Sequence, residues 1–416
     1  MSAGISERVR DLAARAMEEL GPRFAEIDAV SERNTEKVLT AFRENRVSDA
    51  CFGGTTGYGY DDKGREILER VYADVFRGEA ALVRTGFASG THAITCALFG
   101  QLRPGDRLLY ASGLPYDTLQ AAIGIRCSGR GSFKEYGIEY GQVDLTPEGR
   151  PDHRAIAEAA SAENVSVVGI QRSRGYSERD ALSIEDIGDM CDTIRRANPR
   201  AAVIVDNCYG EFTGLTEPLE AGADMIVGSL IKNPGGGLAP SGGYIVGRRD
   251  LVENASYRLT APGIGGEVGA TLGQSRLLFQ GFFMAPHTTA QAMKTAVFCA
   301  KMMELMGFRS SPAWDAKRSD IIQIVELGSE EAMSRFCRGV QLGAPVDSFV
   351  TPVAGDMPGY ECPVIMAAGS FIQGASIELS ADGPMEPPYR VYLQGGLTFE
   401  SGKLGIMLAA EELLKG

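Results

Sequence analysis

Lys232 is the residue whose position most directly suggests chemistry, because it stands between an apolar run and a glycine-rich turn in DMIVGSLIKNPGGGLAPSGG, residues 224–243. The apolar residues from Met225 to Ile231 predict a buried strand. Burial disfavours an ammonium group, so a lysine placed here either pairs with an anion or loses its proton. A neutral lysine is a nucleophile that forms imines with carbonyl compounds. The alternative is a lysine that merely extends its charged end from the strand into water.

Asp206 is the acidic counterpart of this lysine, since it ends a second apolar run, AVIVD at residues 202–206. An acid buried at a strand end needs a cation or a hydrogen-bond donor as its partner. The protonated pyridine nitrogen of pyridoxal phosphate is such a partner, and the aldehyde of this cofactor is the usual carbonyl partner of a reactive lysine. A simple salt bridge between Asp206 and Lys232 is the alternative, but it leaves the glycine-rich loops and Tyr116 without a role.

Two further segments could bind an anion such as a phosphate. Ser89, Gly90 and Thr91 precede a helical pattern, and a helix N-terminus with flanking hydroxyls offers free N–H groups and a partial positive charge. Ser89 as an ordinary helix cap is the alternative. The loop FGGTTGYGYDDKGRE, residues 52–66, offers the hydroxyls of Tyr58 and Tyr60, although it could also be a simple surface turn.

The elements that must position these residues follow an alternating pattern. Strands are predicted at 80–83, 107–111, 165–171, 202–206, 225–228 and 244–247, and helices at 66–76, 118–123 and 184–197. Continuous apolar strands alternating with helices predict an α/β fold with a mostly parallel sheet that binds ligands beyond the carboxyl ends of its strands. Tyr116, residues 171–174, Asp206 and Lys232 should therefore meet at one edge. The glycine motifs of nucleotide-binding folds are absent, which argues against that class.

The chain has 416 residues, enough for two or three domains. Helical patterns at 5–20 and 35–42 predict an N-terminal helical segment, residues 1–50. Residues 51–265 form the predicted large α/β domain. Residues 266–416 form a predicted smaller α+β domain, with a long helix at 286–306, strands at 323–327, 364–368, 377–379 and 390–394, and a last helix.

Composition narrows the class of function. The net charge of −13 argues against non-specific binding to nucleic acid or to an anionic membrane surface. Eight cysteines without a C-x-x-C pair and three scattered histidines predict reduced, buried thiols and no metal site. Acidic residues such as Glu7 and Asp11 stand where a signal peptide would need an apolar core, and no apolar run reaches membrane length, so we expect a cytoplasmic protein.

Several long motifs in one order resemble the aluminium-resistance or methionine γ-lyase-like family of pyridoxal-phosphate enzymes, within the group of cystathionine synthases and lyases. The resemblance runs from about residue 20 to the C-terminus. It rests on VSDACFGGTTGYGYDDKGRE, FASGTHAITCALFGQLRPGD, PYDTL, QRSRGYS, VDNCYGEF, SLIKNPGGGLAPSGGY, RLTAPGIGGEVGATLG and YLQGGLTFE. It implies the fold of type I pyridoxal-phosphate enzymes, with a large domain built on a seven-stranded sheet and a smaller C-terminal domain.

The resemblance also implies a role for each candidate residue. Lys232 would bind the cofactor covalently and move protons, Asp206 would hold the pyridine nitrogen, and Tyr116 would stack on the ring and serve as a general acid. The phosphate would be held by Ser89, Gly90, Thr91 and Ser229, with Tyr58 and Tyr60 reaching the phosphate of a neighbouring subunit. Arg390 would grip the substrate carboxylate, a task suited to a planar two-pronged donor, with Arg258 as its rival.

Two departures from the family pattern stand out. Ile231 occupies the position before the lysine where the wider group usually has threonine, so one phosphate contact must come from elsewhere. QRSRGYS replaces the asparagine-containing loop that touches the phenolic oxygen of the cofactor, and Arg174 is our candidate for that contact. A surface role for Arg174 is the alternative.

The predicted function is elimination of a γ substituent, or less favourably a β substituent, from an L-amino acid with a thiol or halide leaving group. Elimination from a γ-halogenated unsaturated amino acid would give an alkyne. The alternatives are a γ-replacement transferase of the cystathionine synthase type and a non-catalytic cofactor-binding stress protein. Because the tyrosine loop should complete the partner's site, we expect a homodimer or homotetramer.

Overall fold

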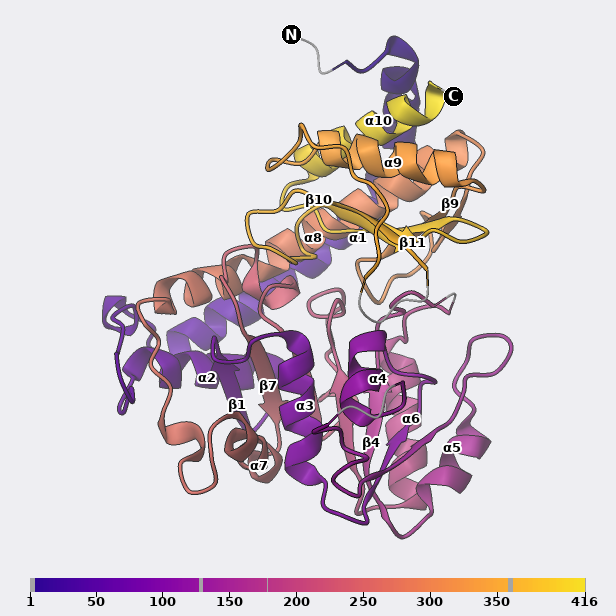
Figure 1. Ribbon diagram of the computed structural model, residues 1–416. Coiled ribbons are helices and arrows are strands. Elements are labelled where there is room, and N and C mark those ends of the chain that lie inside the picture. Colours follow the sequence, from indigo (N-terminus) through magenta and orange to yellow (C-terminus); the bar gives the residue numbers. More distant parts are fainter. Residues whose placement is uncertain (1–3, 127–129, 178, 358–361, 416) are drawn as a thin grey trace.

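The computed structural model contains two β-sheets, one in the lower half of Figure 1 and one in the upper half. It describes residues 4–126, 130–177, 179–357 and 362–415. The large sheet has seven strands in the order β1-β7-β6-β5-β4-β2-β3, with β7 antiparallel to both of its neighbours and the other pairings parallel. The strands are β1 (Ala80–Arg84), β2 (Arg107–Tyr110), β3 (Glu139–Gln142), β4 (Val165–Gln171), β5 (Ala202–Asp206), β6 (Met225–Ser229) and β7 (Gly243–Gly247). The predicted α/β class with a mostly parallel sheet is confirmed.

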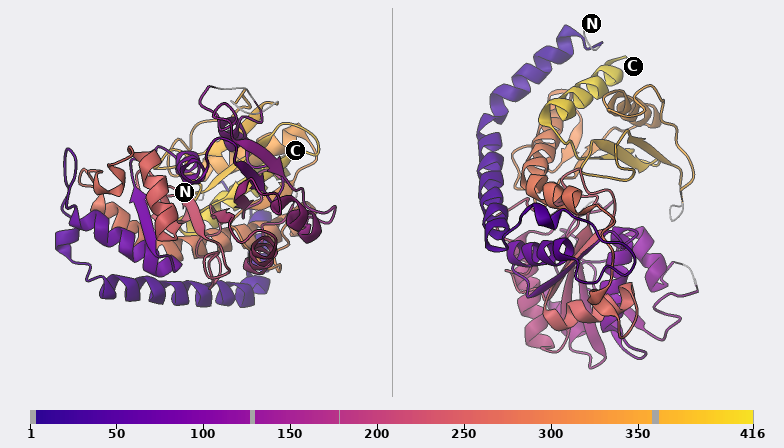
Figure 2. Two further views of the ribbon diagram at one scale, coloured as in Figure 1. Left: turned by 90° about the horizontal axis from the view of Figure 1, so that it is seen from below. Right: turned by 90° about the vertical axis from the view of Figure 1, so that its left-hand side faces the viewer.

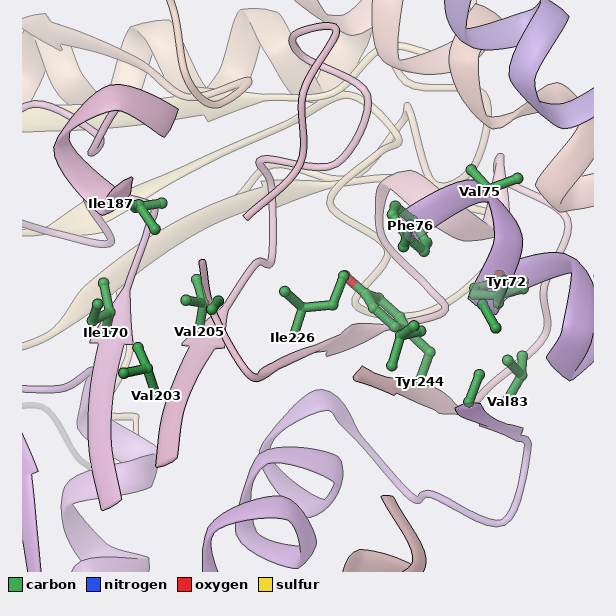
Figure 3. Close-up of a cluster of buried hydrophobic side chains, with 14 of the residues drawn as sticks. Tyr72, Val75, Phe76, Val83, Ile170, Ile187, Val203, Val205, Ile226 and Tyr244 are labelled. Atoms are coloured by element: carbon green, nitrogen blue, oxygen red, sulfur yellow. The ribbon is translucent and has the colours of Figure 1, made fainter. Parts of the chain in front are cut away.

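Helices cover both faces of the large sheet, which explains why its central strands are apolar throughout. One face packs against α2 (Lys63–Phe76), α5 (His153–Ala160) and α6 (Ile184–Ala197). The other face packs against α3 (Gly90–Gln101), α4 (Asp117–Ile123) and α7 (Arg249–Leu259). Figure 3 shows Tyr72 and Phe76 of α2 lying against Tyr244 of β7. The central strands are therefore removed from water on both sides.

The small sheet is antiparallel, in the order β10-β11-β12-β9-β8. Its strands are β8 (Arg309–Ser311), β9 (Gln323–Glu326), β10 (Val364–Ala368), β11 (Ser380–Pro384) and β12 (Arg390–Gln394), and α9 (Glu330–Leu342) and α10 (Phe399–Leu414) pack against one face. The strand predicted at 377–379 is wrong, because the strand begins at Ser380. Ile377 and Leu379 are buried, but pairing with β10 and β12 places the poor strand formers of SADGP in the sheet instead.

A single helix, α1 (Glu7–Glu44), replaces the two separate N-terminal helical patterns. Its buried positions continue at three-, four- and seven-residue spacing past Pro22, so one apolar stripe runs the length of the helix. The stripe packs along α8 (Ser275–Leu305), which is longer than the predicted helix at 286–306. Figure 2 shows α1 running along one side of the molecule past both sheets.

The short 3-10 helices η1 (Asp49–Cys51), η2 (Asn233–Gly235) and η3 (Gly265–Glu267) complete the described elements. The predicted domain boundaries at residues 50 and 265 fall in η1 and at the start of η3, and they stay predictions. Free thiols are found at Cys51, Cys96, Cys191, Cys208, Cys299, Cys337 and Cys362, the first six of them buried, while Cys127 lies outside the described residues. In the part of the chain that the structure describes, no helix is long and apolar enough to cross a membrane.

Candidate active site

A cavity of about 850 Å³ lies at the carboxyl edge of the large sheet, where the small sheet faces it. Its size is within the range of small-molecule sites. The predicted site residues that line it are Ser89, Gly90, Thr91, Tyr116, Arg174, Asp206, Ser229 and Lys232. The parallel strands explain this gathering, because β4, β5 and β6 all end at the same edge.

Lys232 follows β6 and caps η2, so its side chain leaves the sheet at the start of a tight turn. Gly236 ends this turn with a positive φ of 55°, and a Cβ there would lie 2.2 Å from the carbonyl oxygen of Gly281 in α8. The turn must therefore be glycine for α8 to pack against it. The glycine-rich sequence after the lysine thus fixes where Lys232 emerges.

The surroundings of Lys232 are acidic and aromatic. Its Nζ lies 4.0 Å from the centroid of the Tyr209 ring. Burial lowers the pKa of Lys232, but the acidic groups of Cys208, Tyr209, Asp206 and Tyr116 outweigh burial and raise the pKa above its usual range. The side chain of Lys232 lines the cavity, so it does not merely extend away from the protein into bulk water.

Asp206 is a buried acid that has no ion pair within the described residues. Its Oδ1 accepts a hydrogen bond from the backbone N–H of Cys208 at 3.1 Å. Burial raises the pKa of Asp206, while Lys232 and Cys208 act to lower it. A carboxyl group in this state is suited to a ligand that brings its own N–H donor or positive charge.

Tyr116 lies beside the N-terminus of α3. Its hydroxyl donates a hydrogen bond to Thr91 Oγ1 at 3.0 Å, and its backbone N–H donates to Gln171 Oε1 at 3.0 Å. Burial, with Asp206 next in importance, raises the pKa of the Tyr116 phenol well above its usual value. Tyr116 therefore keeps its proton at neutral pH, which is the state required of a general acid.

The N-terminus of α3 and the end of β6 form a cradle for an anion. Ser89 caps the helix by accepting from the N–H of His92 at 3.1 Å, so the cap predicted as an alternative is present. Its hydroxyl proton is still available, as are the N–H groups of Gly90 and Thr91 at the start of the helix. A Cβ on Gly90 would lie 3.1 Å from Cβ of Ser229, so glycine is what lets the helix approach the strand.

These groups fit pyridoxal phosphate. The helix N-terminus with Ser89, Thr91 and Ser229 matches a phosphate, and the unpaired carboxylate of Asp206 matches a protonated ring nitrogen. Lys232 supplies the amine that an aldehyde requires. The N-terminus of α3, Asp206 and Lys232 all line one cavity. The chain therefore offers a suitable partner for the phosphate, the ring nitrogen and the aldehyde of the cofactor.

Four of the predicted residues lie away from the lining of this cavity. Tyr58 and Tyr60 are 73% and 59% exposed, and their rings pack against each other at 5.7 Å. Their loop is held to residues 269–272, because Gly269 N donates to Tyr58 O at 2.9 Å. The Arg258 guanidinium lies 4.3 Å from the ring centroid of Phe99, and Arg390 pairs with Glu326 at 3.2 Å.

Two arginines do line the cavity. Arg174, predicted from the sequence, is buried and pairs with Asp180 at 2.9 Å. Arg179 was missed, and its guanidinium donates to the carbonyl oxygens of Gln171 at 2.8 Å and Ser173 at 2.5 Å. Burial lowers the pKa of Arg179 to about 10, against the effect of nearby Asp320. Arginine 179 could have been found by extending the QRSRGYS motif by two residues.

Sequence reasoning also missed the polar side chains that the small sheet and the loop after β4 contribute. They are Tyr176, Asp382, Tyr392 and Gln394. Tyr176, Tyr392 and Gln394 lie in the motifs QRSRGYS and YLQGGLTFE but were given no role, and Asp382 was missed because its strand was predicted at 377–379.

The seven-stranded sheet, with a lysine and an acid at its carboxyl edge and a smaller antiparallel unit above them, defines a protein of the type I pyridoxal-phosphate fold. The pyridoxal-phosphate-dependent protein YhfS from Escherichia coli shares this fold with a TM-score of 0.63 at 19% identity, covering 94% of this chain and 97% of YhfS.

The chain belongs to the methionine gamma-lyase family, whose model matches residues 9–414. It is 53% identical to the uncharacterized protein YnbB of Bacillus subtilis, over 94% of this chain and 93% of YnbB. It is 30% identical to the L-methionine gamma-lyase of Pseudomonas putida, over 70% of this chain and 72% of that enzyme. A carbon-sulfur lyase involved in aluminum resistance from Clostridium novyi is 50% identical, with a TM-score of 0.95, covering 98% of this chain and 96% of that chain. The resemblance inferred from the motifs is confirmed.

Glu211 is a buried acid that helps to position the turn after Lys232, and its protonation should affect the stability of the protein. Its carbonyl oxygen accepts from Asn233, the residue after the lysine, at 3.0 Å, and its Oε1 accepts from the Tyr244 hydroxyl at 2.7 Å. Burial raises the pKa of Glu211 from 4.5 to about 8. Its Oε2 has no hydrogen-bond partner among the described residues, as suits a protonated acid.

We expect the stability of the wild-type protein to fall between pH 5 and pH 8 relative to a Glu211→Gln variant. The folded state holds the Glu211 proton up to about pH 8, whereas the unfolded chain releases it near pH 4.5, so folding becomes less favourable as the pH rises between these values. The shift of the Glu211 pKa corresponds to a difference in the free energy of unfolding on the order of 5 kcal/mol. Denaturant unfolding at several pH values measures it. The exposed Glu158→Gln is the control, and equal pH profiles for wild type and Glu211→Gln would contradict the expectation.

Proposed function

We propose that this protein is a pyridoxal-phosphate-dependent lyase that eliminates a γ substituent, with a thiol as leaving group, from an L-amino acid. The observation that carries the proposal is the convergence of Lys232, Asp206 and the N-terminus of α3 on one cavity in a chain of the methionine gamma-lyase family. The carbon-sulfur lyase of Clostridium novyi, which is 50% identical, supports the same class of reaction. We further propose that the protein acts in the cytoplasm.

When bound, the cofactor would act as a sink for the electrons released at the substrate carbons. Lys232 would hold the cofactor through its Nζ and then remove the proton from Cα and return protons to the neighbouring carbons. Tyr116, which keeps its phenolic proton at neutral pH, would donate a proton to the leaving sulfur. Asp206 would stabilise the positive charge of the protonated ring nitrogen of the cofactor.

The substrate carboxylate needs a cationic partner. Arg390 and Arg258 were predicted for this role, but in the single chain they pair with Glu326 and stack on Phe99. Arg174 and Arg179 line the cavity. We therefore propose that the carboxylate binds on the side of the cavity lined by Arg174 and Arg179, where both guanidinium groups raise the local positive potential.

The test is a screen of L-amino acids with the cofactor-loaded protein, including thioethers of cysteine and homocysteine and γ-halogenated amino acids. A γ-elimination releases a thiol, ammonia and a four-carbon 2-oxo acid, all detectable by mass spectrometry, whereas β-elimination gives a three-carbon 2-oxo acid. Addition of a second thiol distinguishes a replacement transferase, because the new thioether would form in place of the 2-oxo acid. Retention of cofactor without turnover of any amino acid would contradict the proposal.

We also propose that the active form is a homodimer or a pair of dimers. The exposed side chains of Tyr58 and Tyr60 stand on an ordered loop, fastened by hydrogen bonds from the hydroxyls of Thr55 and Thr271 to Asp62. Large aromatic side chains held rigidly in the open are typical of an interface. Light scattering during turnover tests this, and a fully active monomer would refute it.

A further inference from the structure

The part of the cavity wall that the small sheet forms carries a carboxylate that the proposed reaction does not use. Asp382 lies on β11, where it is directly opposite Tyr392 of β12 in the antiparallel pairing. The neighbouring positions Ala381 and Leu393 belong to the apolar core of the small sheet. Because side chains alternate along a strand, Asp382 and Tyr392 lie on the other face, and both line the cavity.

Asp382 is held in place by hydrogen bonds, and none of the described residues serves as its counterion. Its Oδ1 accepts from the Tyr176 hydroxyl at 2.7 Å, and its Oδ2 accepts from Gln394 Nε2 at 3.3 Å. Only 7% of the residue is exposed. Burial raises the pKa of Asp382 to about 6, and the hydrogen bond from Tyr176 lowers it, with no cationic side chain of the described residues contributing. The acid is thus mostly ionised at neutral pH, buried, and not neutralised.

A buried carboxylate without a counterion is costly, and this one has acceptor capacity left. An ionised carboxylate offers about four acceptor positions, and Tyr176 and Gln394 occupy two of them. Arg174 and Arg179 line the same cavity, but Arg174 is paired with Asp180 and Arg179 donates to backbone carbonyl oxygens. A ligand with a positively charged group near Asp382 would therefore supply the counterion that this carboxylate lacks among the described residues.

Since a substrate bonded at the lysine end extends across the cavity, its side chain would reach the wall of the small sheet. Because the substrate carboxylate is proposed to bind beside Arg174 and Arg179 and would be repelled from Asp382, the group left to face Asp382 is the far end of the side chain. We propose that Asp382 is a specificity-determining residue that selects amino acids whose side chain ends in an ammonium group. This deepens the proposed function, on which it rests, by naming the class of substrate.

The test is a binding measurement on the cofactor-loaded protein with three amino acids of matched length, L-lysine, L-2-aminoheptanoate and L-2-aminopimelate. They end in an ammonium, a methyl and a carboxylate group, and none carries a leaving group. We expect lysine to bind about ten- to a hundredfold more tightly than aminoheptanoate, the range for a hydrogen bond to a charged group, and aminopimelate to bind most weakly. Asp382→Asn should abolish the preference for lysine while changing the affinity for aminoheptanoate by less than about threefold.

Tyr176→Phe separates recognition from a merely structural role. It removes the hydrogen bond to Asp382 but leaves the carboxylate, so the preference for lysine should persist. Absence of a lysine preference in the wild type, or an equal loss of all three ligands in Asp382→Asn, would overturn the proposal. Because binding is measured without elimination, a failure here is distinct from a failure of the amino-acid screen, in which no 2-oxo acid would form.

Discussion

Lys232→Ala will abolish turnover, with a fall in kcat of at least about 10⁴-fold. The variant would lose both the amine proposed to bond to the cofactor and the base proposed to move protons between substrate carbons, and general acid–base catalysis by a positioned group alone contributes about 10²–10⁴-fold. Two measurements check it. The first is the rate of 2-oxo acid release, and the second is borohydride treatment followed by mass spectrometry, which in the wild type should place the cofactor on the peptide that contains residue 232.

The surface variant Lys317→Ala is a matched control. Lys317 is exposed and pairs with Glu185 at 3.0 Å, away from the cavity lining. It should keep both full turnover and the modified peptide. If Lys232→Ala retained turnover and a covalently attached cofactor, the assignment of the whole site would be wrong.

Asp206→Asn will lower kcat by about 10²–10³-fold, the cost of removing one preorganised electrostatic partner from a buried site. Asparagine fills the same volume but cannot carry the negative charge that favours a protonated ring nitrogen. We also expect weaker binding of the cofactor, because the buried positive charge would have no counterion. Steady-state kinetics at saturating cofactor and equilibrium dialysis of the cofactor measure the two effects.

Asp224→Asn provides the comparison for a general loss of stability. Asp224 lies just before β6, at the opposite edge of the same sheet, and pairs with Arg195 at 2.9 Å and Arg248 at 3.4 Å. That variant should be less stable in thermal unfolding but keep its affinity for the cofactor. Unchanged kcat and cofactor affinity in Asp206→Asn would show that the acid does not face the cofactor.

The sequence was sufficient for six of the seven strands of the large sheet because these strands are mostly apolar. Val165–Gln171 and Ala202–Asp206 have the predicted bounds, and both are buried on two faces. β3 (Glu139–Gln142) was missed, since it is an edge strand whose residues are partly or fully exposed. An edge strand with no buried face does not need alternating apolar residues, so its sequence shows no pattern that predicts a strand.

The same reasoning separates the site residues that were found from those that were not. Asp206 and Lys232 follow apolar runs, and the order of strands in a parallel sheet brings such positions together. Asp382 lies in SADGP, a segment of poor strand formers that becomes a strand only through its pairing with β10 and β12. The partners of arginines, such as Asp180 for Arg174, depend on loop conformations that local sequence does not determine.

The length of α1 has a consequence for how the molecule unfolds. Val9, Ala13 and Leu20 complete the apolar core of the small sheet, whereas Val38 and Ala41 complete the core of the large sheet. Neither core is fully covered without this helix, and a helix is itself a cooperative unit. Loss of one core would expose half of the apolar stripe that the other core still needs. The two halves of the chain are therefore thermodynamically coupled, and they should melt together rather than as independent domains.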